Sequence, residues 1–74
     1  MSSDICIQLG ERIRELRKQR GWRQIDLAEH SGIHEVHISD LERGSREIGF
    51  RHLSALAGAF DLSLADFVKT LDVR

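Results

Sequence analysis

The sequence predicts an all-α domain of five short helices around one core, and three observations support this prediction. Apolar residues recur at intervals of three and four, which places them on one face of a helix. No segment alternates apolar and polar residues as a half-buried strand does. Glycines and capping residues separate the successive apolar stripes, so the stripes belong to different helices. At 74 residues, the whole chain (1–74) is expected to form one compact domain.

An apolar stripe predicts the first helix, at about residues 4–20. Its members are Ile5, Leu9, Ile13 and Leu16. Gly10 lies inside this helix, where glycine costs about 1 kcal/mol relative to alanine, so we expect another segment to pack closely there. Gly21 would end the helix, and Trp22 is interpreted as a core anchor rather than a residue that stacks on DNA.

The segment 24–44 predicts two short helices, at about 24–30 and 35–43, joined by a turn at residues 31–33. Gly32 lies in the turn, where a left-handed conformation favours glycine, and Gly44 would end the second of these helices. The apolar residues expected to face inward are Leu27, Ala28, Ile33, Ile38 and Leu41. Two helices joined across a glycine-containing turn form a helix-turn-helix, whose second helix can enter the major groove of DNA.

Two further helices are predicted near the C-terminus, at about 50–60 and from Ser63 to about residue 71. Ser63 and Asp66 have the spacing of a capping box. The residues expected to face inward in the earlier helix are Phe50, Leu53, Ala57 and Phe60. Further apolar residues are either additional core or a self-complementary homodimer surface. The second interpretation assigns to the dimer interface Ile48, Leu56, Leu64, Val68 and Leu71.

The charge of the chain is small but unevenly distributed. A net charge of −1 does not by itself favour a nucleic-acid partner. Residues 1–25 contain six basic and three acidic residues, whereas residues 26–74 contain five basic and nine acidic residues. The basic first helix could therefore present a positive face to phosphate, or it could be an ordinary solvated surface.

We expect a cytoplasmic protein without a membrane partner. No apolar run approaches the roughly 18 residues of a membrane span, and the first residues lack the basic segment of a signal peptide. Cys6 is the single cysteine, so it cannot form an intrachain disulfide and suits a reducing compartment.

A longer pattern across the motif resembles the Cro/C1-type (XRE-like) helix-turn-helix family of phage repressors and small bacterial regulators. The pattern consists of Gln24, Leu27-Ala28, Gly32-Ile33, Ile38-Ser39 and Leu41-Glu42-Arg43-Gly44. The resemblance extends over residues 9–67 and implies a lambda-repressor-like fold in a bacterial or phage-type protein associated with the nucleoid. The segments 32–34 and 42–46 look most like controller proteins of restriction–modification systems. Members of that group are homodimers that bind operator DNA and regulate transcription.

The first group of candidate DNA-binding residues lies at the starts of the second and third helices. Gln24 could hold a phosphate with its side-chain amide and the free backbone N–H groups of the helix end. Arg23 stands where this family usually has a capping Ser or Thr, so a cap worth about 1 kcal/mol is lost and a phosphate contact becomes available. Glu35 can accept a hydrogen bond from cytosine, and Val36 can pack on a thymine methyl. Relatives more often have Gln or Arg at the position of Glu35, so the operator sequence could differ from theirs.

The remaining candidates follow along and after the third helix. Ser39 and Asp40 lie on its surface away from the core, and His37 either contacts DNA or fills the side of the helix. Arg43 and Arg46 flank the turn that follows and suit phosphate. The resemblance favours Arg46, because controller proteins use the matching arginine on DNA.

Arg17 and Glu42 are assigned a structural role by the resemblance. The matching residues of the family often form an ion pair that joins the first helix to the third. Such a pair would orient the third helix, and removing one partner of a buried pair costs a few kcal/mol.

No metal site, cofactor, small-molecule substrate or catalytic group is expected. The histidines are His30, His34, His37 and His52. Structural zinc needs four closely grouped ligands, and no cysteine is placed to help these histidines. The sequence also lacks an arrangement of nucleophile, base and acid, so we predict that the protein is not an enzyme.

The sequence therefore predicts a DNA-binding transcriptional regulator that acts as a homodimer on a near-palindromic operator. Its two recognition helices would lie about one DNA turn, roughly 34 Å, apart. The alternative is a protein-interaction module, such as an antitoxin or anti-repressor, that kept the fold and lost the groove contact. The net charge of −1 and Glu35 favour this alternative slightly.

Overall fold

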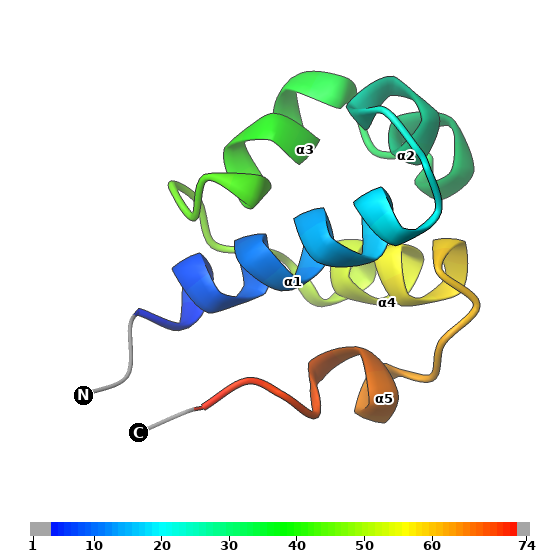
Figure 1. Ribbon diagram of the computed structural model, residues 1–74. Helices are drawn as coiled ribbons and strands as arrows, with labels where there is room; N and C mark the ends of the chain where they lie inside the picture. The colour runs from blue at the N-terminus through cyan, green and yellow to red at the C-terminus, as the bar shows by residue number, and fades with distance from the viewer. Residues whose placement is uncertain (1–3, 73–74) are drawn as a thin grey trace.

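The computed structural model describes residues 4–72 and confirms the predicted all-α class (Figure 1). Its helices are α1 (Ile5–Gln19), α2 (Gln24–Ser31), α3 (Glu35–Glu42), α4 (Phe50–Ala59) and α5 (Leu64–Val68). Residues 4–72 contain no strand. The predicted limits agree with these bounds to within one residue, except that α5 ends at Val68 instead of continuing to about residue 71.

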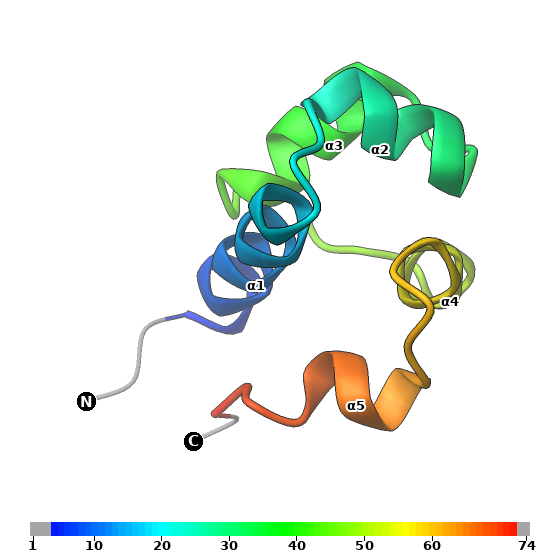
Figure 2. The same ribbon diagram turned by 45° about the vertical axis from the view of Figure 1, so that its right-hand side comes forward.

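The five helices surround one core (Figures 1 and 2). Helix α3 packs on both α1 and α2, and α2 also contacts α4. Helix α5 packs on α4 and lies below α1 in Figure 1, so that the two ends of the described chain are on the same side of the molecule. None of the helices within residues 4–72 combines the length and the apolar character that a membrane crossing requires.

The ends of the helices follow the capping residues of the sequence. The Asp4 carboxylate accepts a hydrogen bond from the backbone N–H of Cys6 at the start of α1 (2.8 Å). Ser63 does the same for Asp66 at the start of α5 (3.1 Å), as its spacing predicts. Gly21 has a φ of +68°, and its N–H and that of Trp22 bond back to the carbonyls of Lys18 and Arg17. This pattern ends α1 in a glycine-capped turn.

The core is built from the inner stripes of all five helices. Its fully buried large side chains are Ile13, Leu27, Ile38, Leu56, Phe60 and Phe67. Trp22 covers one edge, with its ring stacked on His30 (ring centroids 4.1 Å apart) and near Phe60 (5.9 Å). The interpretation of Trp22 as a core anchor agrees with this packing.

Gly10 lets α1 and α3 approach closely, as the sequence predicted. A Cβ atom at this position would lie 2.4 Å from the carbonyl oxygen of Leu41 and 2.5 Å from that of Glu42. Both obstacles are backbone atoms, so they cannot rotate away. Only glycine fits this helix crossing.

Two side chains predicted to face inward are exposed instead. Phe50 is 74% exposed and Ile5 is 41% exposed. Each belongs to the first turn of its helix, beyond the region that the neighbouring helices cover. The inner stripe of α4 runs through Leu53, Leu56 and Phe60 and does not include Phe50.

Arg12 of α1 and Arg20, which follows the last residue of α1, bind backbone carbonyls of the C-terminal half. Arg12 donates to the carbonyl oxygens of Phe67 (2.9 Å) and Asp66 (3.1 Å), and so ties α5 to α1. The Arg20 guanidinium lies over the Phe60 ring (4.9 Å) and also donates to the Phe60 carbonyl. The predicted positive face of α1 is therefore smaller than its number of basic residues indicates.

Candidate nucleic-acid interface

The turn between α2 and α3 is held by local hydrogen bonds. Gly32 has a φ of +75°, and its N–H donates to the carbonyl oxygen of Ala28 (2.9 Å). The Ser31 hydroxyl accepts from the N–H of Ile33 (3.2 Å). His34 then caps α3, because its Nδ1 accepts from the N–H of Val36 (3.1 Å). Sequence reasoning missed this cap, since histidine is not among the usual capping residues.

The C-terminal end of α3 is fixed by a buried ion pair between Glu42 and Arg17. Arg17 Nε lies 2.6 Å from Glu42 Oε2, and Arg17 Nη2 lies 3.0 Å from Glu42 Oε1. The third donor group of the guanidinium, Nη1, binds the carbonyl oxygen of Trp22 (2.8 Å). The hydrogen bond to Glu42 raises the pKa of Arg17 further above its ordinary value. This forked geometry is the one that joins arginine to carboxylate most strongly.

Gln24 belongs to the same cluster. Its Nε2 donates to Glu42 Oε1 (3.1 Å), so the side chain expected to reach phosphate is already bound inside the protein. Glu42 thereby joins the first residues of α2 to α1 and α3. We name Arg17, Gln24 and Glu42 the clamp.

The N-terminal half of α3 projects from this fixed base into solvent. Glu35 is exposed, and Val36 is 63% exposed. Ile38 and Leu41 hold the opposite side of the helix in the core. The first turn of α3 can therefore touch a partner without any change in the core.

A second cluster of polar side chains lies at the C-terminal end of α3 and in the loop that follows. Arg43 donates to the Ser39 hydroxyl (2.7 Å) and forms an ion pair with Asp40. Arg46 also lies near Asp40, with 3.7 Å between Nη1 and Oδ2. The side chains of Arg43 and Arg46 are more than half exposed, so both remain accessible to an external anion.

Arg23 makes a local pair that replaces the missing cap of α2. The Asp26 carboxylate accepts from the backbone N–H of Arg23 (2.7 Å) and from its guanidinium (3.1 Å). These hydrogen bonds lower the pKa of Asp26 and raise that of Arg23. The Arg23 side chain is otherwise largely exposed.

His37 does not lie on the exposed face of α3. It is half-buried, and its ring meets the edge of His52 in α4 (ring centroids 4.7 Å apart, interplanar angle 72°). Burial, followed by the nearby His52 and Arg46, lowers the pKa of His37. Of the two interpretations left open for His37, the structure favours the structural one.

Within residues 4–72, no three His, Cys, Asp or Glu side chains are grouped so that they could hold a metal ion. The contact between His37 and His52 supplies two nitrogen-bearing rings and no further ligand.

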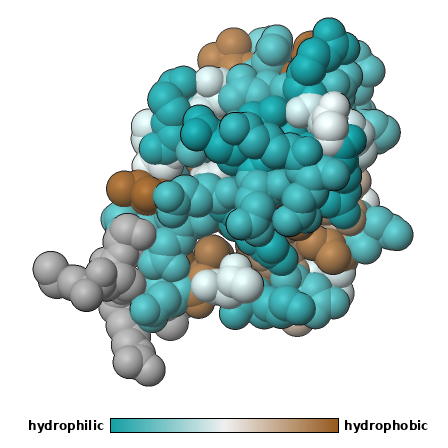
Figure 3. Space-filling model, viewed as in Figure 1, coloured by the Kyte–Doolittle hydropathy of each residue, from teal (hydrophilic) through white to brown (hydrophobic). Residues whose placement is uncertain are grey.

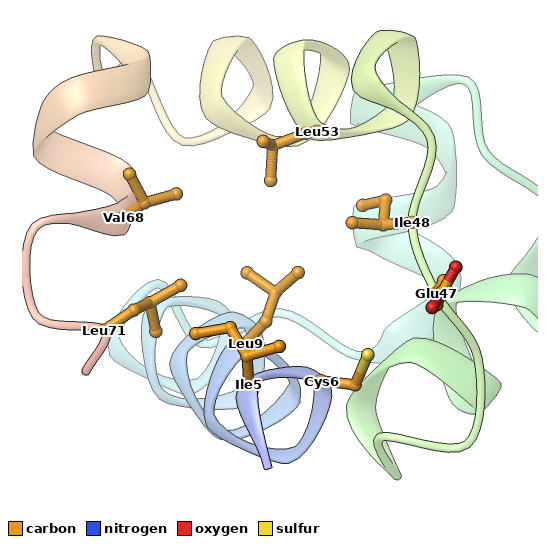
Figure 4. A pocket seen from close by; sticks show the side chains of 8 residues that line it. All are labelled: Ile5, Cys6, Leu9, Glu47, Ile48, Leu53, Val68 and Leu71. Carbon is orange, nitrogen blue, oxygen red and sulfur yellow. The ribbon is translucent and has the colours of Figure 1, made fainter. Parts of the chain in front are cut away.

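The residues assigned to the dimer surface lie in three different places. Leu56 is completely buried in the core, so its assignment to an intermolecular surface is wrong. Ile48, Val68 and Leu71 instead line a groove of about 310 Å³ (Figure 4), and Leu64 lies half-buried outside it. Hydrophobic side chains are visible between α1 and α5 on an otherwise mainly hydrophilic face (Figure 3).

Comparison with known proteins agrees with this architecture. The sequence profile of the helix-turn-helix family HTH_3 matches residues 13–67. The HTH-type transcriptional regulator DdrOP3 of Deinococcus deserti is 35% identical over 66 residues, which are 89% of this chain and 51% of the relative. The chain thus spans about half the length of that relative.

Two solved structures of controller proteins are similar over most of both chains. The restriction–modification controller protein C.AhdI of Aeromonas hydrophila superposes with a TM-score of 0.80 at 32% identity, covering 84% of this chain and 94% of that one. The controller protein C.Esp1396I, solved as a tetramer with its natural operator, gives a TM-score of 0.82 at 26% identity, covering 92% and 90%. The match of the family profile over most of the chain, together with the helix-turn-helix geometry of α2 and α3, shows that this chain belongs to the helix-turn-helix family HTH_3.

Proposed function

We propose that this chain is a transcriptional regulator that binds operator DNA as a homodimer, with α3 lying in the major groove. The observation that carries the proposal is the exposed first turn of α3, projecting from a helix whose other end is held by the buried clamp. A recognition helix needs this combination, because base contacts are specific only when the helix has a fixed orientation. We assign the regulator to the cytoplasm and assign it no enzymatic activity.

The side chains around α3 suit the two kinds of contact that DNA recognition requires. Glu35 and Val36 would face base edges, with cytosine and thymine as their preferred partners. Arg23, Arg43 and Arg46 would face phosphates. Ser39 and Asp40 would contribute mainly by holding Arg43 in place. Gln24 would contribute through the clamp and the free N–H groups at the start of α2.

A finer proposal is that the protein is a restriction–modification controller. The support is that C.AhdI and C.Esp1396I match over nearly their whole lengths. Genes for a DNA methyltransferase and an endonuclease beside the gene of this chain would bear out the assignment. A neighbourhood without either gene would contradict it.

The test of DNA binding is an electrophoretic mobility shift on fragments from upstream of the protein's own gene, over a series of salt concentrations. If Arg23, Arg43 and Arg46 of both subunits each neutralise one phosphate, about six phosphates are contacted. The logarithm of the association constant should then fall linearly with the logarithm of the salt concentration, with a slope of roughly −5. Arg46→Ala should reduce the size of this slope by about 2, one for each subunit. Failure to bind any fragment at low salt would contradict the proposal and leave the protein-interaction alternative.

A matched pair of variants tests which surface reads the sequence. Glu35→Gln should change the preferred base opposite α3, because an amide donates where a carboxylate only accepts. Asp61→Asn removes the same charge in the loop between α4 and α5 and should leave operator preference unchanged. Equal effects of the two variants would mean that α3 does not read the DNA.

A further inference from the structure

The exposed Phe50 is the largest unexplained apolar feature of the described surface. It is the first residue of α4 and is 74% exposed. An aromatic side chain can bury about 150–250 Å² when it is covered, so leaving the ring in water forgoes a large hydrophobic contribution. The packing of residues 4–72 leaves most of this side chain uncovered.

An apolar groove that could receive such a side chain is lined in part by residues around the start of α4. It has a volume of about 310 Å³, and its side chains point toward a common hollow from α1, α4, α5 and the loop before α4 (Figure 4). The apolar side chains that line it are Ile5, Leu9, Ile48, Leu53, Val68 and Leu71. Phe50 follows Ile48 by two residues and precedes Leu53 by three, so its backbone lies beside the groove.

The rim of the groove and the surroundings of Phe50 have opposite charges. Glu47 lines the groove. Burial, followed by the nearby carboxylates of Asp4 and Glu47, raises the pKa of the Cys6 thiol. Arg51 directly follows Phe50 and is exposed. A second copy that places Phe50 in the groove would bring Arg51 to an acidic rim.

We infer that Phe50 of each subunit inserts into the α1–α4–α5 groove of a second copy, with Arg51 of one subunit beside Glu47 of the other. This inference rests on the proposed homodimer and names its anchor. A two-fold axis between the copies makes the exchange reciprocal, because each chain carries both the exposed ring and the groove. A single aromatic anchor in an apolar pocket, surrounded by charged rim contacts, is the usual arrangement of an interface hot spot.

The first test measures self-association without DNA by sedimentation velocity over a range of protein concentrations. Phe50→Ala should raise the dimer dissociation constant roughly a thousandfold, since two anchors are lost in each dimer and one hot-spot anchor accounts for about 30-fold. Val36→Ala removes a similarly exposed apolar side chain from α3 and should leave the dissociation constant unchanged. Circular dichroism of both variants checks that they remain folded.

The second test uses charge reversal at the rim. Glu47→Arg and Arg51→Glu should each weaken self-association roughly tenfold, because each creates two like-charge contacts in the symmetric dimer. An equimolar mixture of the two variants should recover the association of the wild type, since a mixed dimer restores both attractive pairs. The two positions also lie four residues apart in one chain, but mixing leaves that internal repulsion unchanged, so recovery reports contacts between subunits.

The outcomes separate this inference from the proposed function. A wild-type chain that remains monomeric, an unchanged dissociation constant for Phe50→Ala, or a mixture that fails to recover would overturn the inference, whatever happens with DNA. Normal dimerisation with no operator binding would overturn the proposed function and leave the Phe50 contact standing.

Discussion

At the scale of single residues, Gly10 determines how α1 and α3 cross. Alanine has the better intrinsic helix propensity, but its Cβ would lie within 2.5 Å of two carbonyl oxygens that cannot move aside. We expect Gly10→Ala to lower the free energy of unfolding by about 1–3 kcal/mol, the usual cost of overpacking.

Gly58→Ala is the matched control for this substitution. Gly58 also lies in a helix but is exposed, and no atom lies within 4 Å of a Cβ built there. Here the propensity term acts alone, so the free energy of unfolding should rise by about 0.5–1 kcal/mol. Urea unfolding of both variants measures the difference, and two changes of the same sign would contradict the close approach at Gly10.

Two arginines lie near the Glu42 carboxylate, and they differ in how far their side chains are buried. Arg17 is largely buried in its contact with Glu42, whereas Arg14 lies 3.7 Å from the same carboxylate with a side chain that is 54% exposed. Arg17→Met should cost about 3–5 kcal/mol, because it leaves a buried carboxylate without its main partner. Arg14→Met should cost less than about 1 kcal/mol. Thermal or urea unfolding measures both, and similar costs would argue against the clamp.

At the scale of elements, the burial of His37, followed by its contact with His52, makes the place where α3 meets α4 sensitive to pH. The pKa of His37 is lowered in the folded chain, so the unfolded chain binds a proton there more readily. The contribution of neutral His37 to the free energy of unfolding is therefore fully present well above pH 6.5, the ordinary pKa of histidine. It is lost as the pH falls through and below that value.

His37→Gln tests this dependence. The variant should show a shallower loss of unfolding free energy between about pH 7 and 5 than the wild type, because it has no proton to bind at this position. Urea unfolding at several pH values measures the slope. An identical slope in the two proteins would show that His37 does not couple to folding.

The sequence predicted helices, turns and caps well where the signal is the spacing of residues within one segment. The stripe from Leu9 to Leu16, the turn at Gly32 and the cap at Ser63 are all local signals, and the structure contains each of them. The close packing at Gly10 was also predictable, because a glycine inside a helical stripe has a cost that some contact must offset.

The predictions of burial and of side-chain contacts were wrong where they depend on how a second helix packs against the first. The α4 spacing cannot tell that neighbouring helices cover Leu56 but not Phe50. Likewise, Arg12 was counted as part of a charged surface although its guanidinium binds carbonyls of α5. Side-chain hydrogen bonds between distant segments, including that of Gln24 with Glu42, leave no periodic signal.

At the scale of the whole molecule, the proposed dimer connects stability to concentration. A chain of this size buries only about 60% of the surface that its unfolded chain exposes, less than a larger domain does, so an interface contributes noticeably to its folding. The thermal midpoint of the wild type should rise with protein concentration, because association favours the folded state by mass action. The midpoint of Phe50→Ala should rise much less, as differential scanning calorimetry over a hundredfold concentration range would measure. Parallel curves for the two proteins would contradict a role of Phe50 in the dimer.

The separation along α3 between the clamp and the exposed first turn also has an evolutionary consequence. Glu42 lies seven residues, or roughly 10 Å, from Glu35 along the helix axis. Mutations at Glu35 and Val36 can therefore accumulate without disturbing the residues that fix the helix. A gene duplicate of such a regulator could drift toward a new target while its scaffold stays intact, so divergent binding preferences can arise through single, individually viable substitutions.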